Sequence, residues 1–222
     1  MSLKEKLLDK IEEKAILEYD TKLCEDLQRH LSSLSIESRV VFPGTSECIH
    51  GRVLLEFGRL LIGCLKVEGR NFNQIDIVKY VGGGGGKGGG TYTLYYYGYV
   101  VSGRPGENKD DFQVQIKAIK KGLLSRELIG FEWRGGSLAE RLNSDLELTS
   151  MVKKLGEGAP GLGIGGIVVG WGTTFHAHAS RHEDSLTFWQ PLRDSTDLPS
   201  REDIDVANRA CMQIRSMVQA SI

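Results

Sequence analysis

Apolar residues recur every three or four positions in the first 34 residues of the chain and again in two later segments. Because that spacing places side chains on one side of a helix, it predicts a long N-terminal helix, a middle helix over residues 137–155 and a C-terminal helix over residues 200–220. Each helix begins with a capping pattern, formed by Ser2 with Glu5, Ser137 with Glu140 and Ser200 with Asp203. The N-terminal stripe comprises Leu3, Leu7, Ile11, Ala15, Tyr19, Leu23, Leu27, Leu31 and Leu34.

The middle of the chain changes to short, β-type segments. Turns at Pro43-Gly44, Gly58-Arg59 and Pro105-Gly106 separate them. Because consecutive strands have short links and no helices between them, we expect an antiparallel meander. The expected strands are residues 38–42, 49–57, 60–68, 74–81, 91–101, 112–120 and 127–133, with a further hairpin from 167–179 and 186–192.

This order of elements predicts an α+β protein. Its antiparallel, meander-rich sheet would have about eight strands, and the three helices would pack on one face or end of it. We expect a single domain over residues 1–222, in which the glycine-rich loop 156–166 is the one candidate boundary.

Composition and charge narrow the function classes. Lys plus Arg (28) nearly balances Asp plus Glu (29), so the chain lacks the basic excess typical of a nucleic-acid-binding protein. It shows no signal segment and no apolar run long enough to span a bilayer, so we expect a cytoplasmic protein without membrane contact. The four cysteines, Cys24, Cys48, Cys64 and Cys211, form no CxxC pair and are expected to be reduced and buried.

The stretch YVGGGGGKGGGTYTLYYYGYV, residues 80–100, suggests a phosphate-binding loop at first sight. It fails that test because Val81 stands at the first required glycine, Gly88 stands where Ser or Thr is needed, and a strand follows instead of a helix. Two interpretations remain: a long hairpin tip, or an anion-binding nest in the loop Gly82–Gly90 around Lys87. The second would make the chain a phosphate-ligand-binding protein.

The tyrosines that follow the glycines alternate along their strand. Tyr95, Tyr97 and Tyr99 share one face. They could form a stacking platform for a flat small-molecule ligand, together with Lys87. The alternative is a sheet face on which tyrosine simply packs well.

Three of the five histidines fall in HAHASRHED, residues 176–184. His176 and His178 would share a strand face, with Cα atoms about 6.6 Å apart, which suits two ligands of one ion. His182 could complete a zinc or similar divalent transition-metal site. Either Glu183 or Asp184 could activate water there. The alternative is a polar strand end with solvated histidines.

The motifs identify no particular family. The leading hypothesis is a non-catalytic role, in which the sheet binds a ligand or the N-terminal helix assembles a homo-oligomer. The rivals are a metal-dependent hydrolase using His176, His178 and His182, and a phosphate-binding protein using the loop around Lys87.

Overall fold

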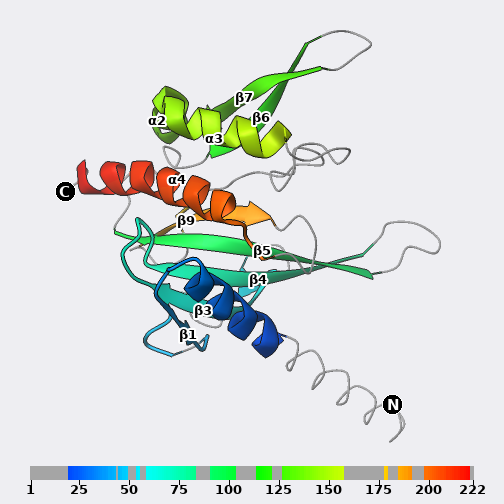
Figure 1. The fold of residues 1–222 in the computed structure, drawn as a ribbon, viewed down its shortest axis with the longest axis vertical. Helices are drawn as coiled ribbons and strands as arrows, with labels where there is room; N and C mark the ends of the chain where they lie inside the picture. The colour runs from blue at the N-terminus through cyan, green and yellow to red at the C-terminus, as the bar shows by residue number, and fades with distance from the viewer. Residues whose placement is uncertain are drawn as a thin grey trace, which may run out of the picture.

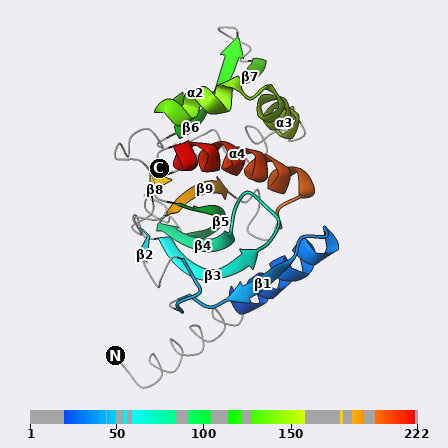
Figure 2. The same ribbon diagram turned by 90° about the vertical axis from the view of Figure 1, so that its left-hand side faces the viewer.

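The computed structural model describes residues 20–43, 45–49, 54–55, 59–83, 91–103, 114–121, 127–157, 178–179, 185–191 and 198–220. These residues form an α+β structure, as predicted (Figure 1). The C-terminal helix α4 (Arg201–Ala220) lies between the main sheet and a second unit of one hairpin and two helices (Figure 2). None of the described helices is both long enough and apolar enough to span a membrane.

The main sheet is antiparallel throughout the described residues. It has seven strands in the order β1-β3-β4-β5-β9-β8, and β2 pairs with β3 beside β1. The strands are β1 (Ser38–Val41), β2 (Leu54–Leu55), β3 (Arg59–Val67), β4 (Gln74–Gly83), β5 (Thr91–Ser102), β8 (His178–Ala179) and β9 (Ser185–Pro191). The predicted meander is confirmed for β3, β4 and β5. The β4–β5 ladder extends into the start of the glycine run, where Gly83 pairs with Thr91.

The remaining strands, β6 (Val114–Lys121) and β7 (Glu127–Gly135), pair only with each other among the described residues. The prediction of one sheet of about eight strands is therefore only partly right. The apolar side of this hairpin, which includes Ile116 and Trp133, is buried and in contact with α2. The edge of β5 is instead paired with β9, whose Phe188 ring lies 6.1 Å from that of Trp133.

The N-terminal helix, described over residues 20–33, packs on the main sheet (Figure 1). Its predicted apolar stripe is confirmed in this part, because Leu23, Leu27 and Leu31 are buried in the core. The helix lies very close to β3 at Gly63, where an added Cβ would come within 2.1 Å of the Cys24 sulfur. Only glycine permits this approach. The rest of the stripe lies outside the described residues.

The predicted middle helix is two helices, α2 (Ser137–Ser144) and α3 (Leu146–Glu157). Asp145 ends the first, and its carboxylate caps the second by accepting a hydrogen bond from the Leu148 amide at 3.0 Å. The predicted capping box at Ser137 is wrong, because α2 begins at that residue after Gly136 and has no side-chain cap. The helix boundary was missed because no glycine or proline marks it.

The C-terminal helix agrees with its prediction in both its cap and its buried face. The Ser200 hydroxyl donates to Asp203 at 2.6 Å and accepts from the Asp203 amide at 3.1 Å. Its predicted apolar face is buried, through Ile204, Ala207, Cys211, Ile214 and Val218.

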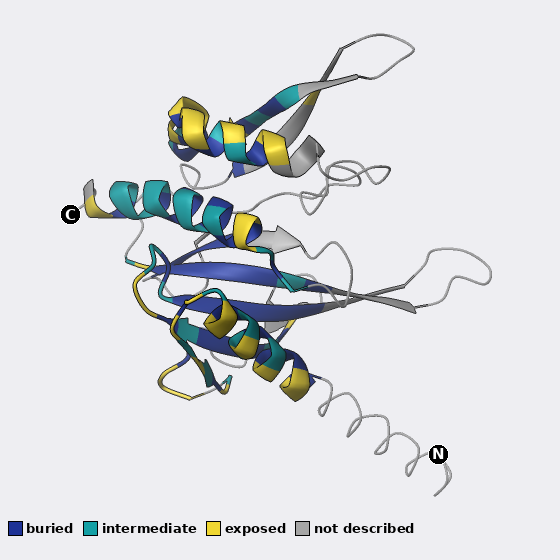
Figure 3. Ribbon diagram, viewed as in Figure 1, coloured by how far each residue is buried: buried dark blue, intermediate teal, exposed yellow. Residues whose placement is uncertain are grey.

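The two faces of the main sheet differ in what covers them. Both the N-terminal helix and α4 lie on one face, and together they enclose the larger core (Figure 3). The opposite face has a small cluster of Val41, Cys48, Leu61, Cys64 and Val78, with Tyr96 beside it. A bulge between Leu61 and Gly63 shifts the register, so that Leu61 and Cys64 reach the same face although they are three residues apart.

Candidate metal centre

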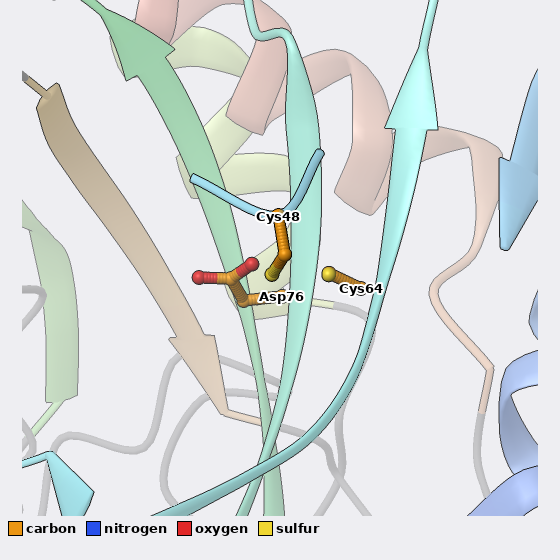
Figure 4. Close-up of side chains that lie close together, drawn as sticks. All are labelled: Cys48, Cys64 and Asp76. Carbon is orange, nitrogen blue, oxygen red and sulfur yellow. The ribbon is translucent and has the colours of Figure 1, made fainter. Parts of the chain in front are cut away.

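A compact group of metal-ligating side chains lies on the face opposite the helices. Cys48, Cys64 and Asp76 each offer one ligand atom, and these three atoms all lie within 4.8 Å of one another. Figure 4 shows the Cys64 sulfur directed towards Cys48, with the Asp76 carboxylate beside them. All three residues are buried, with Cys64 and Asp76 fully so. No other such group occurs within the described ranges.

Strand pairing brings two of these residues together. Cys64 on β3 stands directly opposite Asp76 on β4. Directly opposite residues of antiparallel strands have Cβ atoms about 4.5–5.5 Å apart on the same face. The Cys64 thiol also donates to the Val41 carbonyl across the β1–β3 ladder, at 3.3 Å. This ligand pair is therefore built on the β3–β4 ladder, and β1, at the edge of the sheet, accepts the hydrogen bond of the Cys64 thiol.

The third residue, Cys48, comes from a turn that follows β1. The Thr45 amide donates to the Phe42 carbonyl at 3.3 Å, and the Cys48 amide donates to the Thr45 carbonyl at 3.2 Å. Arg39 and Glu47 form a 2.7 Å ion pair on the exposed side of the turn. These contacts place Cys48 over β3 and β4 (Figure 4).

A fourth polar side chain, Gln74, connects the turn to the strands and is itself fully buried. Its Nε2 donates to Asp76 Oδ1 at 2.6 Å and to Cys48 Sγ at 3.7 Å. Its Oε1 accepts from the Ile49 amide at 3.1 Å. The group is thus a hydrogen-bonded network of two thiols, a carboxylate and an amide.

The environment keeps Cys64 protonated. Its hydrogen bond with Cys48 and its burial both raise the pKa of the Cys64 thiol well above its ordinary value. Burial also raises the pKa of Cys24, on the opposite face, to about 12. These thiols are therefore weak nucleophiles without an ion that displaces the proton.

The predicted ligand-binding tyrosines lie on the other face of the sheet. Tyr95 is 5% exposed, and Tyr97 and Tyr99 are fully buried beneath the helices. The Tyr99 ring packs edge-on against Phe72, with centroids 5.0 Å apart. The predicted alternation is confirmed, since Tyr96 contacts the opposite cluster. Their proposed role as a stacking platform stays a prediction, but a ligand would first have to displace the covering helices.

One of these tyrosines belongs to a buried ionic group. Lys79 Nζ lies 3.4 Å from Asp20 Oδ1 and 5.8 Å from the centre of the Tyr95 ring. Burial raises the pKa of Asp20, although Lys79 partly opposes the shift. This group joins the N-terminal helix to β4 and β5, and all of its members are paired with one another.

Most of the predicted histidine and loop sites lie outside the described residues, namely His176, His182, Glu183, Asp184 and Lys87. Only the backbone of His178 is placed. It pairs with Thr187, in a row that continues through Val100 to Gln74. Three ladders of about 4.8 Å put it about 14 Å from Gln74. The structure thus does not join His178 to the cysteine–aspartate group.

The cysteine–aspartate group was missed because its members are far apart in sequence. Cys48 and Cys64 have no metal-ligand spacing, and Asp76 lies between Ile75 and Ile77 in a β-type segment. That buried carboxylate was the one available signal, because a charged residue in a buried strand needs partners.

No model of a known protein family, no curated protein and no solved structure matches this chain significantly. Its function must therefore be argued from the site itself.

Proposed function

We propose that this protein has a non-catalytic binding role and that its ligand is a divalent metal ion of the zinc class, held by Cys48, Cys64 and Asp76. The observation that carries the proposal is the approach of these three ligand atoms to within 4.8 Å of one another. In a tetrahedral zinc site, ligand atoms at about 2.0–2.3 Å from the ion are about 3.3–3.8 Å apart. A contraction of up to about 1.5 Å would therefore close the group on an ion.

The ligand chemistry favours zinc over hard cations. Thiolates select soft or borderline metals, whereas calcium and magnesium require oxygen ligands. Exchanging two thiol protons for one divalent ion leaves the net charge of the buried group unchanged. A divalent ion therefore adds no buried charge, which would otherwise cost several kcal/mol.

The burial of the site favours a structural or storage role over catalysis. Cys64 and Asp76 are fully buried and Cys48 is 6% exposed. A catalytic metal needs an open position that substrate can reach. A structural site would fill the fourth position of a tetrahedral ion with a further group of the chain.

The proposal is tested by titrating the reduced, metal-free protein with Co²⁺, a spectroscopic substitute for zinc. We expect one tightly bound ion, a thiolate-to-cobalt charge-transfer band in the near ultraviolet, and displacement of cobalt by Zn²⁺. Cys48→Ser and Cys64→Ser should each weaken the band to that of a single thiolate, whereas Cys24→Ala and Cys211→Ala, which alter buried cysteines elsewhere, should leave it unchanged. A wild-type protein that gives no thiolate band would refute metal binding at this site.

Homo-oligomer formation through the N-terminal helix also stays a proposal. The apolar stripe of residues 20–33 is buried against the protein's own sheet. Assembly would therefore have to use the part of the stripe that lies outside the described residues. A strictly monomeric mass in sedimentation equilibrium would exclude it.

A further inference from the structure

We infer that Gln74 is the positioning residue of this metal centre and that it holds the Asp76 carboxylate and the Cys48 turn in place. The inference rests on the proposed metal binding and concerns how the site is built. Gln74 contacts two of the three ligands, Asp76 and Cys48, and also the backbone amide that follows Cys48, so one side chain ties the turn to the strand.

The orientation of the Gln74 amide follows from its contact with the backbone. The Ile49 amide is a donor, so the atom that faces it at 3.1 Å must be the carbonyl oxygen of Gln74. The two N–H groups of Nε2 therefore face Asp76 and Cys48. The Ile49 contact thus aims both donors at metal ligands.

This donor arrangement orients the carboxylate. Asp76 Oδ1 accepts the short 2.6 Å bond from Gln74, which holds the carboxylate in place beside the thiols. Coordination through one carboxylate oxygen suits a small tetrahedral ion, whereas calcium binds carboxylates through one oxygen or through both. Outer partners of this kind fix the ligand orientation in metal sites and typically contribute about 10–100-fold to affinity.

The same amide also holds Cys48 in place. Cys48 lies in a turn, and the contacts of Gln74 with its sulfur and with the next residue's amide tie that turn to β4. Without Gln74 the ligand pair of Cys64 and Asp76 would remain on the sheet, because strand pairing builds it. Cys48 would lose these two contacts between its turn and β4.

The test compares Gln74→Met, which keeps the size of the side chain and removes its polar atoms, with Thr187→Val. Thr187 is a matched control because it lies in the same row of the sheet, is 1% exposed, and has a hydroxyl without a hydrogen-bond partner in the described structure. We expect Gln74→Met to weaken Co²⁺ binding about 10–100-fold and to reduce the thiolate band. Thr187→Val should bind Co²⁺ as the wild type does.

A second readout needs no metal. Iodoacetamide labelling of the reduced, metal-free protein, resolved by residue with mass spectrometry, should show Cys48 modified severalfold faster in Gln74→Met. The rates at Cys24 and Cys211 should not change. If Gln74→Met does not fold, Gln74→Leu replaces it, because leucine is apolar and neither donates nor accepts a hydrogen bond.

The two readouts separate the two proposals. A wild-type protein without a thiolate band refutes metal binding, and the labelling rate of Cys48 then still decides whether Gln74 positions the turn. If Gln74→Met binds cobalt with the wild-type affinity and its Cys48 is labelled at the wild-type rate, Gln74 does not position the site.

Discussion

Two buried carboxylates, Asp145 and Asp76, have very different surroundings. Asp145 lies between α3 and α4, where it accepts hydrogen bonds from Arg209 and Gln213 at 2.7 Å each and from the Leu148 amide at 3.0 Å. Asp76 lies on the opposite side of the main sheet, beside two thiols and the amide of Gln74. The first group joins helices, whereas the second gathers metal ligands.

The difference between them lies in the chemistry of the partners. Burial alone would raise the pKa of the Asp145 carboxyl, but the hydrogen bonds from Arg209, the Leu148 amide and Gln213 outweigh burial and hold it below its usual value. An arginine partner neutralises a carboxylate permanently. Thiols instead carry protons that a metal ion can replace. Asp145 therefore stabilises the contact between the helices, whereas metal binding by Asp76 is the proposal that the following variants test.

The largest expected effect on stability comes from Asp145→Ala. It removes the cap of α3 and leaves Arg209 without its buried partner, so we expect the free energy of unfolding to fall by about 3 kcal/mol. The measurement is urea unfolding of the metal-free protein. The affinity for Co²⁺ should stay at the wild-type value. A parallel loss of affinity would show that the Asp145 group and the Asp76 group are not independent.

Asp76→Asn should show the reverse pattern. Asparagine keeps the shape and can still accept from Gln74, but it removes the anionic ligand. We expect the affinity for Co²⁺ to fall by about 100-fold or more, since a direct ligand should contribute at least as much as an outer partner. Urea unfolding of the metal-free variant should stay within about 1 kcal/mol of the wild type. Unchanged affinity would remove Asp76 from the ligand set.

Gly63→Ala perturbs only the helix-covered face. The added methyl would clash with the Cys24 sulfur, so we expect unfolding stability to fall by about 1–3 kcal/mol. Adding Cys24→Ala removes the sulfur and should recover part of the loss, which urea unfolding of the single and double variants measures. Additive losses would show that the helix does not approach β3 this closely.

The smallest expected effect is a pH dependence of metal affinity. Because the raised pKa keeps Cys64 protonated in the metal-free protein, metal binding must release that proton. The affinity for Co²⁺ should therefore rise at least about tenfold per pH unit between about pH 6 and 8, below the ordinary thiol pKa of about 8.5. Cobalt titrations at several pH values measure the slope. A flat profile would mean that no thiol titrates on binding.

Local sequence patterns predicted the features that depend on residues close together in the sequence. The stripe through Leu23, Leu27 and Leu31 and the Ser200–Asp203 cap were correct because helix periodicity and capping depend on near neighbours. The break at Asp145 was not predicted, because the partners that fix it, Arg209 and Gln213, lie more than sixty residues away.

The metal centre depends even more on distant contacts. The pairing of Cys64 with Asp76 requires the β3–β4 register, which the bulge after Leu61 shifts. The position of Cys48 requires the fold of a turn that carries no regular pattern. Periodicity contains neither piece of information, so the sequence could suggest only that four isolated cysteines are buried, which the structure confirms.

The most direct test of the central claim is X-ray absorption spectroscopy of the zinc-loaded protein. If Cys48, Cys64 and Asp76 hold the ion, the zinc shell contains two sulfur atoms at about 2.3 Å and oxygen or nitrogen atoms at about 2.0–2.2 Å. Cys64→Ser should leave one sulfur. A shell made only of oxygen and nitrogen atoms would contradict the account and return attention to His176, His178 and His182.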